Sequence, residues 1–260
     1  MSRLQWGVTF FSVALFALLY FGFDVKTDEQ QRQAAVRSAN LESTDINALK
    51  RAALENLSAE NKNRIRIAEQ ELSIAESDSA KVAANIELSG AWYRLQQPAI
   101  AGYHAQEVAQ INNTEDTWSI AGTTYAICVQ RSERLEVRQF CTTRAVQAFE
   151  NAISLNPSNV QHKVNLALTY LDTEAPMMGI QMLLRLNQED PENVLVLRTL
   201  GEQAIRSGQL DKALERFLQV LSIEPDNNQA NCAVADLYQQ LEQPQQAQLY
   251  ADKCIKERSK

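Results

Sequence analysis

Apolar residues recur along the chain at two spacings. The shorter spacing is three or four residues, as in Ile46, Leu49, Ala53 and Leu57, and it predicts amphipathic helices. The longer spacing is about 34 residues, and it runs through the C-terminal half of the chain. A fixed period of this length predicts stacked copies of one small structural unit, each too small to bury its apolar face alone.

The size of the residues also repeats with the longer period. Prolines, small residues and aromatic residues each return in phase, and an extra copy begins near residue 118. The positions that define the repeat are Gly122, Tyr125, Ala145, Phe149, Pro157, Ala167, Tyr170, Pro191, Gly201, Ala213, Phe217 and Pro225.

This pattern resembles the tetratricopeptide repeat (TPR), a helix–turn–helix with the same period. The unit 194–227 shows it most clearly, although Ala204 stands where the family often has Tyr. The small residues allow two helices to cross closely, and Phe217 is expected to fill the space between units. We expect Gly208 to end the first helix in a left-handed conformation. Pro225 is expected to end the second helix, because proline lacks an amide hydrogen.

The resemblance implies an all-α superhelical solenoid of TPR hairpins over residues 82–260, preceded by a single transmembrane helix. Residues 44–81 are expected to form a helical capping hairpin, with a degenerate repeat or a short coiled segment as alternatives. The last unit is the most polar and is expected to cap the other end. The expected units are 82–114, 115–159, 160–193, 194–227 and 228–260.

The unit 115–159 breaks the period. Tyr125 and Ala145 are 20 positions apart, whereas Ala204 and Ala213 are nine apart, so this unit carries 11 extra residues at about 129–141. Eleven residues make about three helical turns, so both helices could lengthen without losing phase. Such an insertion is either a binding surface or a tolerated loop extension.

Residues 4–23 carry no charge and number 20, which as a helix spans about 30 Å, the thickness of the bilayer core. Trp6 and Tyr20 lie near the two ends, as aromatic residues do at the headgroup level. We expect an uncleaved membrane anchor in the lipid bilayer. The alternative is a cleaved signal peptide, which the length of the segment and the absence of a small-residue cleavage site disfavour.

The flanks of this segment suggest its orientation. Residues 1–3 form a tail that is too short to be a domain, and residues 24–43 form a polar linker. A short tail before a hydrophobic segment is typical of a signal anchor, whose N-terminus stays in the cytoplasm. We therefore expect a single-pass protein of the bacterial inner membrane, with its TPR domain in the periplasm.

Composition and charge exclude several functions. The formal net charge is −7 and there is no basic block, so nucleic-acid binding is not expected. The two histidines, His104 and His162, are expected to be polar surface or partly buried residues without a catalytic role, in a second and a first helix respectively. No catalytic, cofactor or metal motif is present, so we expect a protein that is not an enzyme and needs no cofactor.

The four cysteines form two pairs, each within one repeat. Free thiols are favoured for Cys232 and Cys254, because small buried residues are the usual role of free cysteine. For Cys128 and Cys141 the choice is open, because a disulfide would tether the insertion. In the unit 160–193, Met177 and Met178 replace the usual turn, and we interpret them as adaptable packing.

The resemblance also implies a partner-binding groove lined by the first helices of the repeats. Its mixture of apolar and polar residues suits an extended peptide or a partner helix. A neighbouring segment that shields the apolar members is the alternative. The groove positions are Gln161, Val164, Leu168, Leu171, Leu195, Arg198, Glu202, Ile205, Gln229, Cys232, Asp236 and Gln239.

These features predict a membrane-tethered scaffold or adaptor that binds protein partners in the cell envelope. The layout of anchor and repeats resembles the ancillary TPR subunit of the bacterial Sec translocon, which works with membrane-anchored periplasmic chaperones. One alternative is an assembly factor that holds client proteins for envelope or cofactor biogenesis. Another is a structural homo-oligomer that self-associates through residues 44–76.

Overall fold

The computed structural model describes residues 45–255, and within that range every regular element is a helix. These helices form one compact unit from Ile46 onward. None of the helices between residues 45 and 255 is long and apolar enough to cross a membrane. The expected anchor at 4–23 and linker at 24–43 lie outside the described residues.

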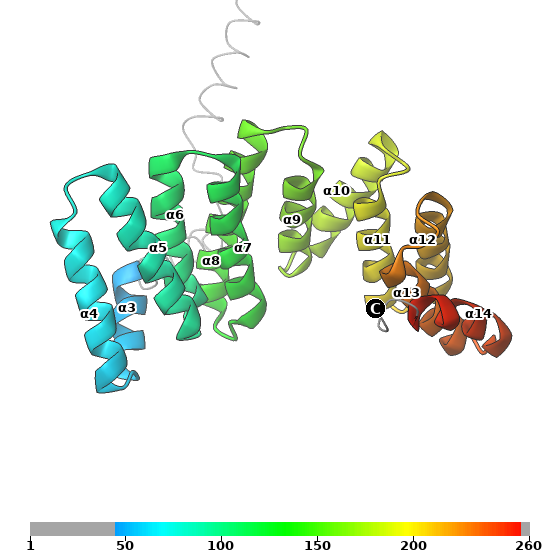
Figure 1. The fold of residues 1–260 in the computed structure, drawn as a ribbon, viewed down its shortest axis with the longest axis horizontal. Helices are drawn as coiled ribbons and strands as arrows, with labels where there is room; N and C mark the ends of the chain where they lie inside the picture. Colours follow the sequence, from blue (N-terminus) through cyan, green and yellow to red (C-terminus); the bar gives the residue numbers. More distant parts are fainter. Residues whose placement is uncertain (1–44, 256–260) are drawn as a thin grey trace, which may run out of the picture. The chain divides into compact units, whose positions relative to one another are not determined.

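The helices follow one another with short connections (Figure 1). Their bounds are α3 Ile46–Glu55, α4 Ala59–Ile74, α5 Asp78–Arg94, α6 Pro98–Asn112, α7 Glu115–Arg131, α8 Leu135–Leu155, α9 Val160–Leu171, α10 Pro176–Glu189, α11 Val194–Arg206, α12 Leu210–Ile223, α13 Asn228–Gln240 and α14 Pro244–Ile255.

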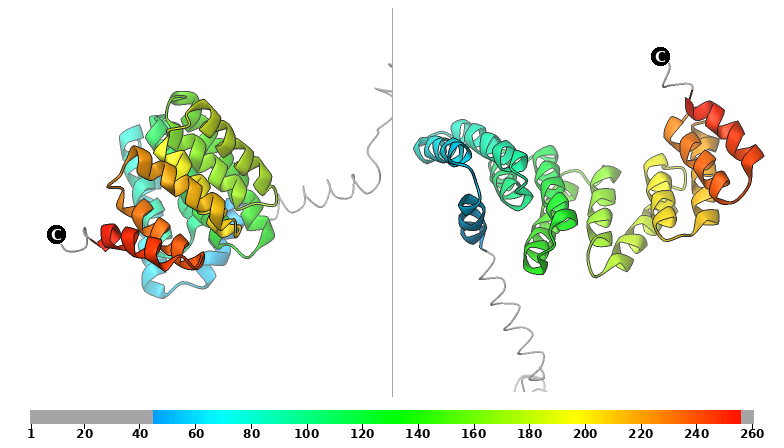
Figure 2. Two further views of the ribbon diagram at one scale, coloured as in Figure 1. Left: turned by 90° about the vertical axis from the view of Figure 1, so that its right-hand side faces the viewer. Right: turned by 90° about the horizontal axis from the view of Figure 1, so that it is seen from below.

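From α5 onward the helices pair into five antiparallel hairpins: α5–α6, α7–α8, α9–α10, α11–α12 and α13–α14. Each hairpin also packs on the next one, so the hairpins lie side by side in the order of the sequence (Figures 1 and 2). We call α5, α7, α9, α11 and α13 the first helices and their partners the second helices. This arrangement is the all-helical repeat fold that the longer period of the sequence predicts.

In two hairpins, a glycine of the first helix lies against an aromatic ring of the second helix, and this contact allows the two helices to cross closely. A Cβ atom on Gly122 would lie 2.8 Å from the Phe149 ring, and one on Gly201 would lie 2.8 Å from the Phe217 ring. Both phenylalanines are buried, and Phe217 belongs to a cluster that also includes Val234 of the next hairpin. The expected role of Phe217, filling the space between units, is therefore confirmed.

The turns inside the hairpins α5–α6, α11–α12 and α13–α14 share one geometry. Gly208 has φ +73°, and the amide of the next residue, Gln209, donates to the carbonyl of Ala204 at 2.8 Å. One period later Gln243 donates in the same way to Tyr238 at 2.9 Å, with Glu242 at φ 60°. These are the hydrogen bonds of a Schellman-type helix end, so the predicted left-handed stop at Gly208 is confirmed.

Asparagines begin the first helices of the three C-terminal hairpins, a role that our sequence analysis did not assign to them. The side-chain oxygens of Asn159, Asn193 and Asn227 accept hydrogen bonds from backbone amides in the first turns of α9, α11 and α13. These bonds satisfy amides that have no partner within the helix. The signal was present in the sequence, because the three asparagines recur with the period of the repeat.

The 11 extra residues lengthen the helices of the second hairpin. α7 has 17 residues where α11 has 13, and α8 has 21 where α12 has 14. The differences, four and seven residues, account for the whole surplus. The predicted lengthening of both helices is therefore confirmed, and the connection between them stays short.

The first two described helices, α3 and α4, pack on different neighbours. α4 packs on α5, whereas α3 packs on α6. Ile46 and Leu49 of α3 contact two apolar clusters, one under α5–α6 and one inside the extended hairpin α7–α8. Helix α3 therefore covers second helices, and α4 covers the first exposed hairpin of the row.

Candidate partner-binding surfaces

The predicted groove residues on α9, α11 and α13 fall into exposed and packed groups. Gln161, Ile205, Asp236 and Gln239 are exposed, and Arg198 and Glu202 are half-buried. The exposed and half-buried members on α9, α11 and α13 therefore leave a mixed polar and apolar surface on three successive first helices. We call this surface, defined by Gln161, Leu168, Leu195, Arg198, Glu202, Ile205, Asp236 and Gln239, the first-helix face.

A polar cluster joins two hairpins on this face. Arg198 of α11 donates to the side chain of Gln229 of α13 at 3.0 Å, and Gln229 donates to Glu202 at 3.3 Å. Arg198 and Glu202 also form an ion pair at 3.7 Å along α11. The structure thus brings together three predicted groove residues from neighbouring repeats and holds them in one network.

Two predicted groove residues are not available to a partner. Val164 is 1% exposed and packs inside the α9–α10 core with Leu183 and Val196. Cys232 is bonded to Cys254 of α14, with their Cα atoms 4.9 Å apart, so our expectation of free thiols at this pair was wrong. Leu168, Leu171 and Leu195 are half-buried against the same core as Val164. A first helix has only a narrow stripe free, because its remaining faces pack on two neighbours.

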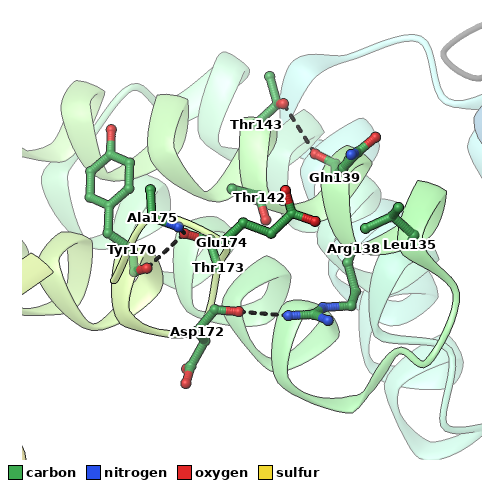
Figure 3. A pocket seen from close by; sticks show the side chains of 10 residues that line it. All are labelled: Leu135, Arg138, Gln139, Thr142, Thr143, Tyr170, Asp172, Thr173, Glu174 and Ala175. Carbon is green, nitrogen blue, oxygen red and sulfur yellow. Dashed lines mark hydrogen bonds between the residues drawn. The ribbon is translucent and has the colours of Figure 1, made fainter. Parts of the chain in front are cut away.

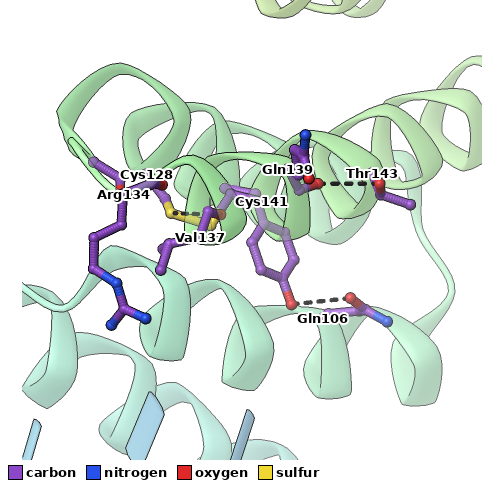
Figure 4. The surroundings of a disulfide bond; sticks show 9 residues. Gln106, Cys128, Arg134, Val137, Gln139, Cys141 and Thr143 are labelled. Carbon is purple, nitrogen blue, oxygen red and sulfur yellow. Dashed lines mark hydrogen bonds between the residues drawn. A yellow bond between two sulfur atoms is a disulfide. The ribbon is translucent and has the colours of Figure 1, made fainter. Parts of the chain in front are cut away.

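The extended hairpin α7–α8 is closed by a second disulfide. Cys128 and Cys141 are bonded, with their Cα atoms 6.0 Å apart, and both are buried (Figure 4). They lie in a cluster with Val137, Phe140 and Tyr125, on which α3 packs. This settles the choice that the sequence left open for this pair in favour of a bond.

A pocket of about 300 Å³ lies where α8 meets the turn between α9 and α10 (Figure 3). Polar residues line most of it, among them Thr142, Thr143 and Thr173, with Leu135 at one side. Arg138 crosses its edge and donates to the backbone carbonyl of Asp172 at 2.9 Å. Gln130 donates to the Asp172 carboxylate at 2.8 Å. Two residues of the extension therefore fasten it to the next hairpin.

The junction between α7 and α9 contains the buried histidine His162. Its Nε2 lies 2.8 Å from the Glu115 carboxylate, which also accepts from Asn156 at 2.9 Å and Asn159 at 3.2 Å. The hydrogen bond from Asn156, followed by that from His162, holds the pKa of Glu115 below its usual value. This network fixes the position of α9. His162 is buried within it, whereas we expected a residue at the polar surface or only partly buried.

His104 of α6 is 1% exposed. Its Nδ1 lies 2.8 Å from Oδ1 of Asn85, whose amide nitrogen donates to the carbonyl of Lys81. Because that oxygen can only accept, Nδ1 carries the proton of the neutral ring. Burial, with a further contribution from the charge of Lys50, lowers the pKa of His104 to about 3. The ring is therefore neutral at physiological pH and joins α5 to α6.

No group of three or more His, Cys, Asp or Glu side chains between residues 45 and 255 is arranged to hold a metal ion.

Comparison with known proteins agrees with this fold. The family model of the tetratricopeptide repeat matches residues 229–260. No curated protein matches the chain.

Several solved structures are similar in fold. MamA (41–end) from Desulfovibrio magneticus RS-1 is 18% identical with a TM-score of 0.46, covering 72% of this chain and 99% of that one. Another crystal structure of MamA protein is 16% identical with a TM-score of 0.44, covering 67% of this chain and 90% of that one.

YrrB, described as a TPR protein with an unusual peptide-binding site, is 17% identical with a TM-score of 0.40, covering 70% of this chain and 92% of that one. Because these identities and TM-scores are low, nothing about function is inferred from them. The last hairpin thus matches the tetratricopeptide repeat, within a chain whose described residues form an all-helical row of stacked hairpins.

Proposed function

We propose that this protein is a scaffold, not an enzyme, that binds protein partners on its first-helix face. The observation that carries the proposal is the exposure of polar and apolar side chains along three successive first helices, although the core of each hairpin is filled. A stripe of this kind fits an extended peptide or a helix, because alternating apolar and polar contacts give both affinity and register.

The partners are proposed to lie in the periplasm, next to the membrane. Two disulfides among the described residues support an oxidising compartment, because such bonds are rare in the cytoplasm. The uncharged segment 4–23 supports a tether to the inner membrane. A role beside the Sec translocon and its periplasmic chaperones is a narrower version of this proposal, supported by the layout of the chain alone.

Crosslinking in cells tests the binding face. A photoreactive amino acid is placed at Leu168, Arg198 or Glu202 in the full chain, and the same probe at Arg134 of the extension serves as the comparison. We expect discrete crosslinks to another protein from the first three positions and few from the fourth. Crosslinks from Arg134 alone would contradict the choice of face.

The location can be tested independently. Exposed Ser154 is replaced by cysteine, which would be labelled in intact cells by a maleimide that crosses only the outer membrane. Labelling before cell lysis supports the periplasmic proposal, and labelling only after lysis contradicts it. Mass spectrometry of proteins that copurify in mild detergent tests the translocon version, which fails if no translocon or chaperone subunit is present.

A further inference from the structure

A second pocket, of about 510 Å³, opens between α10 and α12 and the C-terminal ends of α9 and α11. Its lining residues come from both first and second helices. None of the residues that define the first-helix face lines it, so it is a different surface. Its apolar lining residues are Leu171, Met177, Ile180, Leu184, Leu200 and Ala204. We call it the α10–α12 pocket.

Exposed apolar side chains stand at its mouth. Met177 is 62% exposed and Leu184 is 41% exposed, so their apolar atoms remain in contact with water. Met178 beside them is 49% exposed. Our interpretation of the two methionines as adaptable packing was therefore wrong. Methionine suits a surface that must adapt to a partner, because its side chain is flexible and polarisable.

Gly179 lets α10 approach α9 closely. It occupies the position that Ala213 holds in α12, one period later. A Cβ atom on Gly179 would collide with the carbonyl oxygen of Ala167 and would lie 2.8 Å from the Leu171 side chain. Helix α10 therefore lies against the backbone of α9, closer than an alanine would allow.

The rim of the pocket is basic, in a chain whose net charge is −7. Lys212 and Arg216 are one turn apart on α12, and no carboxylate lines the pocket. Lys212 donates to Gln209 at 2.7 Å and Arg216 donates to Gln219 at 3.1 Å, so both contact neutral amides. Neither takes part in an ion pair within residues 45–255. The third cation, Arg206, pairs with Asp172 at 3.5 Å.

We propose that the α10–α12 pocket is a docking site for an acidic amphipathic segment of a partner protein. An apolar side chain of that segment enters between Met177, Leu184 and Leu200. Aspartate or glutamate residues beside it meet Lys212 and Arg216. Charge complementarity of this kind selects the partner and speeds encounter more than it adds affinity, while the apolar contact holds the complex together. The scaffold then has two binding surfaces, the first-helix face and the α10–α12 pocket.

Selection from random peptides tests this chemistry without a known partner. Phage displaying random 12-residue peptides are selected on the full chain in detergent. The same library is selected on the double variant Lys212→Glu/Arg216→Glu. We expect the unaltered chain to enrich peptides with Asp or Glu next to Leu, Met or Phe, and the variant to lose them. The matched control is Arg51→Glu/Arg66→Glu, which changes net charge equally at exposed positions on α3 and α4, away from the pocket.

Affinity measurements on an enriched peptide then sharpen the result. Fluorescence anisotropy is expected to show binding at least about tenfold weaker for Lys212→Glu/Arg216→Glu, and a loss of affinity as salt rises. Leu184→Gln is expected to weaken binding several-fold, whereas Leu155→Gln, at an equally exposed leucine outside the pocket, leaves it unchanged. Circular dichroism confirms that each variant is folded.

Two outcomes would overturn the proposal. One is a selection that enriches no acidic and apolar peptides. The other is an enriched peptide that binds the Lys212→Glu/Arg216→Glu variant as well as it binds the control. Neither outcome bears on the first-helix face, because the crosslinking positions Leu168, Arg198 and Glu202 lie outside this pocket.

Discussion

The hairpins α7–α8 and α11–α12 hold their helices together through the same contact, an aromatic ring lying on a glycine. In α11–α12 the helices end soon after this contact, and an exposed glycine makes the turn. In α7–α8 both helices continue, a disulfide joins the extensions, and a further apolar cluster forms around it. The same repeat unit can therefore be either a short module or a long cross-linked one.

The extension changes what surrounds it. Helix α3 packs on its cluster through Ile46 and Leu49, and Gln130 and Arg138 fasten it to the next hairpin. Helix α3 and the hairpin α9–α10 therefore both pack on the extended hairpin. Three-turn lengthening permits this, because whole turns preserve the side of the helix that each residue faces. The hairpins α11–α12 and α13–α14 lie outside these contacts.

Removal of the buried rings is expected to give the largest effect. Phe149→Ala and Phe217→Ala each remove a buried ring, which costs about 3–5 kcal/mol of local stability. Hydrogen exchange read by mass spectrometry should show α11–α13 opening more in Phe217→Ala than α7–α8 opens in Phe149→Ala. The reason is that the disulfide and the longer helices still hold α7 to α8. Equal opening of both hairpins would remove the contrast between them.

Loss of the disulfides should come next. Cys128→Ser/Cys141→Ser opens a loop with a sequence separation of 13, and a loop of this size is worth about 3 kcal/mol. We expect exchange to rise in α3 as well as in the extension, because α3 packs on the same cluster. Cys232→Ser/Cys254→Ser is the matched pair, and its effect should stay within α13 and α14. Unchanged exchange in α3 would show that the stability of α3 does not depend on the disulfide of the extension.

The third prediction concerns the effect of pH on the hairpin α5–α6, which contains His104. His104 has a folded pKa of about 3 against about 6.5 unfolded, so between these values only the unfolded chain binds the proton. Stability is therefore full above pH 6.5 and falls as pH drops toward 3, by about 1.4 kcal/mol per pH unit. At pH 5 this amounts to roughly 2 kcal/mol.

Exchange at pH 5 and pH 7.5, corrected for intrinsic rates, measures this effect. We expect α5 and α6 to lose protection at the lower pH, with α11 and α12 little changed. His104→Gln keeps a polar side chain that does not titrate, so it should abolish the pH dependence in α5 and α6. The persistence of that dependence in His104→Gln would assign it to another group.

The smallest expected effect concerns helix starts. Asn193→Ala removes the cap of α11 and should cost about 1 kcal/mol. Arg134 is the N-cap residue of the extended helix α8 and makes no side-chain cap hydrogen bond, so Arg134→Asn should raise the stability of the helix by a similar or smaller amount. Exchange in the first turns of α8 and α11 measures both changes. A loss of stability in Arg134→Asn would mean that the Arg134–Glu136 ion pair matters more than a cap.

The hairpins could be predicted because their determinants lie close together in sequence. Gly208 marks the turn because glycine adopts a positive φ without strain. The 11-residue surplus allowed both helices to lengthen because it amounts to about three helical turns. The groove was less predictable. Val164 has the position of a groove residue and yet is buried, because the neighbouring hairpin packs closely enough to cover it. The distance between the two hairpins depends on side chains that are more than thirty residues apart in the sequence.

By itself, the sequence determined the period, the helix pairs and the turns, because small residues, rings, glycines and prolines act on neighbours within one unit. Only the tertiary structure decided which cysteines are bonded, where α3 lies, and that Met177 and Leu184 stay exposed beside Lys212 and Arg216. These features depend on how closely and at what angle one helix pair lies against the next. A local pattern does not encode that geometry, because it results from the packing of all the side chains at each interface.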